Sequence, residues 1–250
     1  MRLIRTFTHP TWVNGRRWHF AAVLGAVLAL MASVNLLDHF GPARTGLVLG
    51  PSVAVALLVL SRRSGLSWDD LGLARGSWRR GALVALGSVA LVALAYALAV
   101  ALPATRLAFL DARYQLPVGR ALFTALVVIP LSTVLVEEVA FRGVLMGLLT
   151  RRRSARWGLG GSSGLFGLWH VLPSLGLGSV NHAVAGVAGT GGAARVVIVA
   201  AVVGFTALAG VLLGELRRRS GSLLASAGLH WAVNGVGVIF TATLFALRVS

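Results

Sequence analysis

Seven long runs of predominantly apolar residues divide the chain, and they constrain its fold more than any other feature. They lie at about 20–37, 46–60, 81–102, 121–149, 157–175, 196–213 and 223–247. A helix of about 20 apolar residues spans a bilayer of about 30 Å. The composition agrees, with 57% hydrophobic residues, 12% charged residues and a mean hydropathy of +0.84. The sequence therefore predicts an all-α, polytopic transmembrane helical bundle of about seven spans.

No repeat or low-complexity linker interrupts these runs. We therefore expect one integral-membrane domain over residues 1–250, with a motif-bearing core over 121–247. The segment 176–194 is rich in glycine, which predicts a loop in which Asn181 and His182 are solvated.

The basic residues are all arginines, and they lie mainly between the apolar runs. On alternating sides of the predicted spans they number 16 against 6, with Arg142 inside the fourth run. The positive-inside rule then places the N-terminus in the cytoplasm. Arginine-only basic usage indicates a bacterial source and hence the bacterial cytoplasmic membrane. Because the arginines form no single polar face, the net charge of +16 does not indicate nucleic-acid binding. The absence of cysteine excludes disulfides, thiolate metal ligands and a cysteine nucleophile.

Three charged residues, Glu137, Glu138 and Arg142, interrupt the fourth apolar run. A charge near the bilayer centre costs about 2.5–3.5 kcal/mol on insertion scales, so such residues indicate a functional site. Glu138 and Arg142 have i, i+4 spacing and can pair on a helix. Glu137 is rotated by about 100° from Glu138 and needs another partner.

Two later runs carry further polar groups at helical spacing. Phe166 and His170 are four residues apart in the fifth run, as are His230 and Asn234 in the seventh. If bundle packing brings these side chains near the glutamates, the site holds the groups that hydrolysis requires. A carboxylate beside an imidazole can take a proton from water, and an imidazole with an amide can stabilise an oxyanion.

Two mechanisms fit these residues equally well. In the first, Glu137 with His170 generates the nucleophile from water, and His230 with Asn234 binds the oxyanion. In the second, Glu137, His170 and His230 are ligands of a divalent metal such as zinc and leave a position for water. The spacing does not choose between them.

The three motifs resemble those of the CAAX-protease and bacteriocin-processing (CPBP, or Abi) membrane proteases. The family patterns are Glu-Glu-x-x-x-Arg, Phe-x-x-x-His and His-x-x-x-Asn or Asp. This chain has Glu137-Glu138 with Arg142, then Phe166 with His170, then His230 with Asn234, in the family's order. The resemblance covers residues 131–235, and the earlier spans match only in being hydrophobic.

The resemblance implies an all-helical intramembrane endopeptidase, described in the family as a metalloprotease. Its substrates would be prenylated (CAAX-type) or other membrane-associated proteins or peptides within the lipid bilayer. It implies that Glu137 and His170 activate water, that His230 and Asn234 form the oxyanion site, and that Glu138 with Arg142 supports them.

Three other interpretations remain. Gly161-Ser162-Ser163-Gly164 matches the Gly-x-Ser-Gly pattern of rhomboid serine proteases, although such clusters also occur where membrane helices pack closely. Intramembrane carboxylates and histidines also serve proton- or ion-coupled transporters. Finally, the fold can persist in a non-catalytic immunity or scaffold protein.

Overall fold

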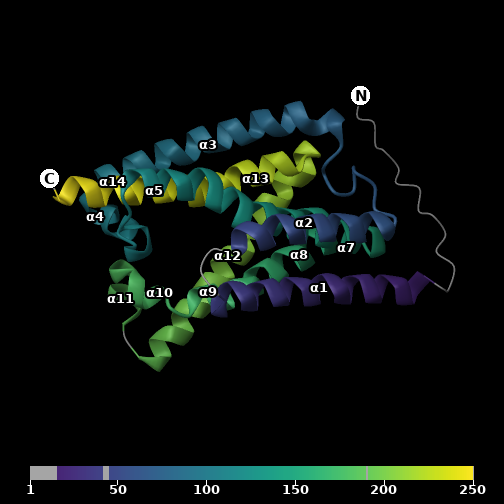
Figure 1. Cartoon of the computed structure of the whole chain (residues 1–250), viewed down its shortest axis with the longest axis horizontal. Helices are drawn as coiled ribbons and strands as arrows, with labels where there is room; N and C mark the ends of the chain where they lie inside the picture. Colours follow the sequence, from purple (N-terminus) through teal and green to yellow (C-terminus); the bar gives the residue numbers. More distant parts are fainter. Residues whose placement is uncertain (1–15, 42–44, 190, 250) are drawn as a thin grey trace.

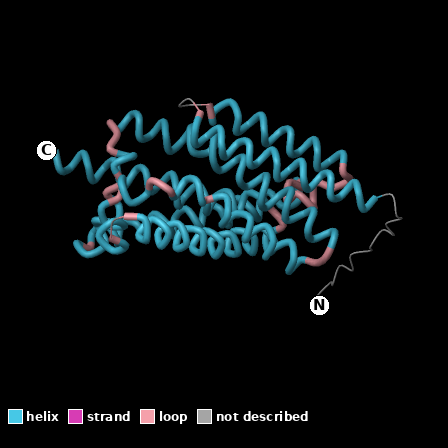
Figure 2. Tube along the Cα trace, turned by 90° about the horizontal axis from the view of Figure 1, so that it is seen from below, coloured by secondary structure: helices cyan, strands magenta, loops and turns pink. Residues whose placement is uncertain are grey.

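The protein is described by a computed structural model covering residues 16–41, 45–189 and 191–249. The predicted orientation also used Arg2, Arg5 and Arg44, which lie outside these residues. The described part is helical (Figure 1), with long helices side by side along the molecule and most loops near its two ends (Figure 2). The long and motif-bearing elements are α1 (Arg16–Phe40), α2 (Gly46–Arg63), α3 (Trp78–Ala101), α5 (Val118–Phe123), η4 (Thr124–Val134), α6 (Leu135–Glu137), η5 (Glu138–Leu145), α7 (Met146–Arg152), α8 (Ala155–Trp169), α12 (Gly192–Ser220), α13 (Leu223–Trp231), η6 (Ala232–Val236) and α14 (Gly237–Val249).

Shorter helical turns fill the connections. They are η1 (Arg75–Ser77), α4 (Pro103–Arg106), η2 (Leu107–Phe109), η3 (Ala112–Tyr114), α9 (Val171–Ser174), α10 (Leu177–Val180) and α11 (His182–Ala188).

Within the described residues, six helices are long and apolar enough to cross a membrane. They are His19–Phe40, Gly46–Arg63, Arg75–Ala101, Val118–Arg152, Gly192–Ser220 and Leu223–Leu247. The predicted polytopic helical bundle is confirmed. The fifth predicted span differs, because α8 has only 15 residues and ends before His170. At a rise of 1.5 Å per residue it is about 22 Å long, which is shorter than the hydrocarbon core.

The helix from Val118 to Arg152 carries the two glutamates and changes its hydrogen-bonding pattern along its length. Its segments η4 and η5 are π-helical, and so is η6, which contains Asn234. Pro130 lies inside η4 and has no N–H to donate. π-helical turns are rare and are frequent at functional sites. In this chain the π-helical turns lie on the two helices that carry the first and the third motif.

Small residues let the motif-bearing helices approach their neighbours closely. A Cβ atom on Gly228 of α13 would lie 2.3 Å from the Ala85 Cβ of α3, and one on Gly167 of α8 would lie 2.7 Å from the Val203 carbonyl oxygen of α12. Small residues at helix crossings are typical of membrane bundles. These contacts fix α8 and α13, and therefore the imidazoles at their ends.

The loop between α2 and α3 anchors the start of α13. Leu66 and Leu71 of this loop are fully buried, and the Gly72 carbonyl accepts a 2.7 Å hydrogen bond from the Leu223 amide. The Ser222 hydroxyl accepts a hydrogen bond from the Leu224 amide and caps the helix.

The segment 176–194 is not the solvated loop that its composition predicts. It contains α10 and α11, and Asn181 between them is buried. Asn181 forms an antiparallel bridge with Asp111, and its side-chain amide donates a 3.2 Å hydrogen bond to the Ala108 carbonyl. Its side-chain oxygen also accepts from the Ala183 and Val184 amides, an N-cap role that glycine-rich composition does not reveal. The His182 side chain lies outside the described part of the structure.

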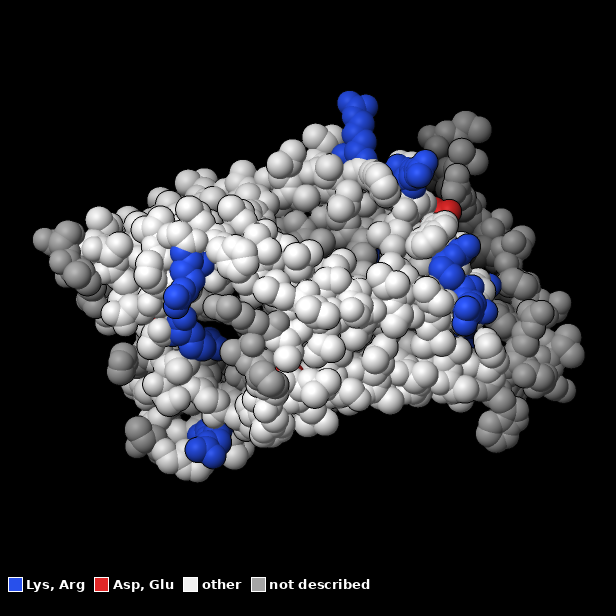
Figure 3. All heavy atoms as spheres, viewed as in Figure 1, with Lys and Arg blue, Asp and Glu red and all other residues white. Residues whose placement is uncertain are grey.

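The basic side chains gather towards the two ends of the molecule and leave its middle largely uncharged (Figure 3). Large apolar side chains such as Leu91, Leu94 and Leu98 of α3 are exposed between these ends. An exposed apolar belt between two charged ends is the surface of a membrane-spanning protein. The chain is an integral membrane protein.

Candidate active site

Glu138, Arg142 and His230 form the buried centre of the site. Glu138 and Arg142 are each 1% exposed, and His230 is 7% exposed. Arg142 Nη1 lies 3.2 Å from Glu138 Oε1, and His230 Nδ1 lies 2.8 Å from the same oxygen. Because a carboxylate oxygen accepts, His230 Nδ1–H is the donor. The pair that the i, i+4 spacing suggests is therefore present in the structure, and its shared oxygen also holds a histidine from α13.

Glu137 is oriented by a different set of contacts. Its Oε1 accepts a 2.9 Å hydrogen bond from Trp169 Nε1, and its Oε2 lies 3.6 Å from His230 Nε2. Oε2 is buried and accepts no hydrogen bond from the described residues. A proton on either Glu137 Oε2 or His230 Nε2 makes the contact between these two atoms attractive. Glu137 thus has one fixed oxygen and one oxygen available for proton transfer.

The Phe166 ring lies at the junction of the three motifs. The Arg142 guanidinium carbon is 3.8 Å from the centre of this ring, which is a cation–π contact. The His170 and His230 rings meet it edge-on, with centroid separations of 4.6 and 5.8 Å. Phe166 therefore packs against one residue of each motif.

His170 follows the last residue of α8, and the end of that helix fixes its ring. Its backbone amide bonds the Gly167 carbonyl in a tighter turn, and its Nδ1 lies 2.8 Å from the Phe166 carbonyl oxygen. A carbonyl only accepts, so Nδ1 carries the proton. In the neutral ring this leaves a lone pair on Nε2. His170 is only half-buried, which leaves its imidazole accessible to water or substrate.

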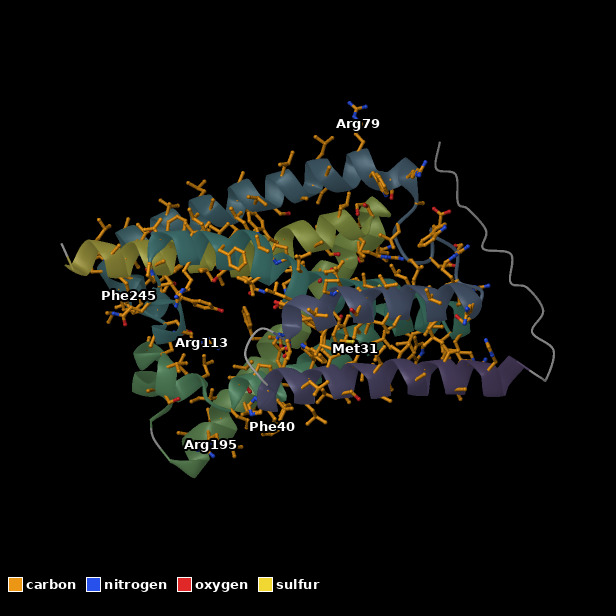
Figure 4. The ribbon with its side chains drawn as sticks, in the orientation of Figure 1. Met31, Phe40, Arg79, Arg113, Arg195 and Phe245 are labelled. Carbon is orange, nitrogen blue, oxygen red and sulfur yellow. The ribbon has the colours of Figure 1, made fainter. Side chains whose placement is uncertain are left out.

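Asn234 is set apart from the other predicted site residues. It is half-buried and lines a cavity of about 340 Å³ with Asp111, Arg113, Tyr114 and Thr241. Neither glutamate of the first motif nor either of the two histidines lines that cavity. Arg113, labelled in Figure 4, forms a two-pronged ion pair with Asp111 there. Burial raises the pKa of the neighbouring Tyr114 hydroxyl.

Three residues near the glutamates were not identified from the sequence. Trp169 binds Glu137, and the Asn35 amide donates a 2.9 Å hydrogen bond to the Trp169 carbonyl. Asp38, one turn after Asn35 on α1, lies close enough to experience the charge of Glu137. Asn35 and Asp38 were detectable as polar residues near the end of the first apolar run. Trp169 was detectable as an indole donor that needs a partner when buried.

Of the three candidate metal ligands, Glu137 and His230 lie together, with 3.6 Å between Glu137 Oε2 and His230 Nε2. In the described ranges, no group of three His, Cys, Asp or Glu side chains is arranged to hold a metal ion. His230 directs Nδ1 at Glu138, and the Nδ1 of His170 is bonded to the Phe166 carbonyl. These contacts engage only the Nδ1 atoms, and through Nε2 each imidazole suits a general base or a metal ligand.

Ser163 of the Gly-Ser cluster lies at a helix crossing. A Cβ atom on Gly210 of α12 would be 3.1 Å from the Ser163 Cα and Cβ atoms. The close helix packing that the sequence offers as an alternative is present. Ser163 is buried, and its hydroxyl has no hydrogen-bond partner among the described residues.

Comparison with protein families finds a match that covers all three motifs. Residues 119–236 match the family described as Type II CAAX prenyl endopeptidase Rce1-like. The predicted resemblance to the CPBP family is confirmed over this segment. Comparisons with curated proteins and with solved structures give no match.

Proposed function

We propose that this chain, whose residues 119–236 match the Rce1-like type II CAAX prenyl endopeptidase family, is an intramembrane endopeptidase that uses a water activated by Glu137 and His170. The observation that carries the proposal is the convergence on the Phe166 ring. The Arg142 guanidinium and the rings of His170 and His230, which the sequence places up to 88 residues apart, meet around this side chain.

Water activation is supported by the free atoms at the site. Glu137 has an unbonded oxygen, and its other oxygen is held by the residue that precedes His170. His170 has a lone pair on Nε2 in its neutral form. A water molecule between these atoms gives one proton to the carboxylate while its oxygen attacks the peptide carbonyl. The protonated carboxyl then returns a proton to the leaving amine.

His230 is suited to bind the oxyanion that forms in this step. Its Nδ1–H is held by Glu138, so a proton on Nε2 makes the ring a cationic donor towards the reacting atoms. Asn234, four residues later in η6, supplies an amide donor when the substrate reaches the separate cavity that Asn234 lines. Arg142 balances the charge of Glu138 and so holds the acceptor that orients His230.

The setting of the reaction completes the proposal. The excess of arginines on one side supports a cytoplasmic N-terminus, and the arginine-only basic usage supports a bacterial source. The whole chain forms one domain with its catalytic core over 121–247. The substrates are prenylated (CAAX-type) or other membrane-associated peptides, which enter the bundle from the lipid.

Kinetics of site variants in proteoliposomes test the proposal. Glu137→Gln and His170→Ala should abolish cleavage, whereas Asn234→Ala should slow it by about 10²-fold. The matched controls are Glu215→Gln and His19→Ala, which make the same changes outside the site and should retain activity. Thermal unfolding checks that each variant is folded. Full activity in folded Glu137→Gln protein would refute the mechanism.

A further inference from the structure

A second cavity, of about 540 Å³, lies beside the proposed active site. It is enclosed by the end of α1, the start of α2 and the segment from α5 to η4. Apolar side chains of Leu47, Phe123 and Val128 line it, together with the polar residues Asp38, Arg120 and Ser132. Its size and its apolar walls with few polar groups are those of a ligand site.

The inner end of this cavity leads towards Glu137. Gly46 brings α2 close there: a Cβ atom at this position would lie 3.0 Å from the Ser132 Cβ and 3.3 Å from Asp38 Oδ1. Ser132 precedes Glu137 by five residues on the same helix. Asp38 lines this end of the cavity. The inner end is therefore acidic and lies about 8 Å from Glu137 along the helix axis.

The outer end carries the opposite charge. Arg120 lines the cavity and is exposed, and it forms no hydrogen bond or ion pair with any residue that the structure describes. A free guanidinium at the mouth of an apolar cavity is suited to bind a carboxylate in a two-pronged contact.

We propose that this cavity binds an extended segment of the peptide substrate and that Arg120 binds a carboxylate on that segment. The inference rests on the proposed endopeptidase function. Arg120 and Glu137 are 17 residues apart on the continuous helix Val118–Arg152, which is about 25 Å along its axis. An extended chain spans about 3.3–3.6 Å per residue. The carboxylate therefore lies about seven to eight residues from the cleaved bond, and Asp38 disfavours acidic residues closer to it.

A series of peptides that differ only in the position of one aspartate tests this assignment. Peptides with an amidated C-terminus and a single Asp, moved one residue at a time away from the cleaved bond, are assayed with the purified chain in neutral-lipid proteoliposomes. We expect kcat/KM to rise about fivefold when the Asp is about seven to eight residues away, which corresponds to about 1 kcal/mol for a partly exposed pair. The gain should come from a lower KM.

Charge variants identify the group responsible. Arg120→Gln should remove the preference, and Arg120→Glu should transfer it to a peptide with Lys at the same position. Arg195→Gln is the matched control, because Arg195 is exposed at the same end of the molecule (Figure 4) and does not line this cavity. It should keep the preference. A flat series in the unsubstituted protein, or a preference that survives Arg120→Gln, would overturn the proposal. A flat series would indicate that Arg120 binds lipid headgroups instead.

Binding separates this inference from the proposed function. Fluorescence anisotropy of the same labelled peptides needs no turnover. Absence of cleavage with retained, Arg120-dependent binding of the acidic peptide would refute the endopeptidase and leave the cavity assignment standing. Cleavage without a charge preference in either assay would support the endopeptidase and refute the cavity assignment.

Discussion

Removal of the Arg142 guanidinium should destabilise the protein strongly. Arg142→Met keeps most of the side-chain volume but leaves Glu138, which is 1% exposed, without its cationic partner. Breaking a buried ion pair in this way costs about 3–5 kcal/mol. For a chain of 150–250 residues, each kcal/mol lowers Tm by about 2–4 °C. We therefore expect Tm to fall by about 6–20 °C.

The companion double variant isolates the cause. Glu138→Gln removes the stranded charge, while its amide oxygen can still accept the hydrogen bond from His230 Nδ1. Glu138→Gln/Arg142→Met should therefore recover at least about 2 kcal/mol relative to Arg142→Met alone, because the cost arises from the uncompensated charge.

The assay is thermal unfolding in detergent, followed by far-UV circular dichroism for the unsubstituted protein, both single variants and the double variant. Activity should stay low in the double variant although its stability recovers. An unchanged Tm in Arg142→Met, or a double variant whose losses are the sum of the two single losses, would refute the reasoning.

Two further predictions concern the elements that hold the site. Trp169→Phe removes the indole donor to Glu137 Oε1; kcat should fall about tenfold with little change in KM, and an unchanged kcat would show that this bond does not position the carboxylate. Gly228→Ala should lower Tm because its new Cβ meets Ala85 at 2.3 Å. Gly87→Ala, with nothing within 4 Å, should raise Tm because the helix propensity of alanine adds up to about 1 kcal/mol to the free energy of unfolding. Equal shifts in unfolding scans of these two variants would contradict the packing argument.

Hydropathy and spacing predicted much of this fold. The six long helices correspond to predicted apolar runs because the bilayer requires a fixed helix length. Spacing also predicted that Glu138 and Arg142 would pair, since two opposite charges one turn apart have few other ways to reduce their desolvation cost.

The contacts between helices could not be predicted from the sequence. Nothing in a single segment indicates that His230 would contact both glutamates, or that Trp169 would hold Glu137, because helix rotation and depth are set by packing at residues such as Gly228 and Gly167. The π-helical turns at Glu138 and Asn234 also lack a local pattern that hydropathy can detect. Periodicity therefore identified the polar residues but not their partners.

The most direct test of the central claim is product analysis by mass spectrometry. Purified protein in proteoliposomes is incubated with a pool of membrane-anchored peptides in ¹⁸O-enriched water, with Glu137→Gln protein in parallel. Hydrolysis by an activated water predicts new C-terminal carboxylates that carry ¹⁸O in the unsubstituted protein and no such products with the variant. Intact peptides in both samples, or the same products with Glu137→Gln, would contradict the account.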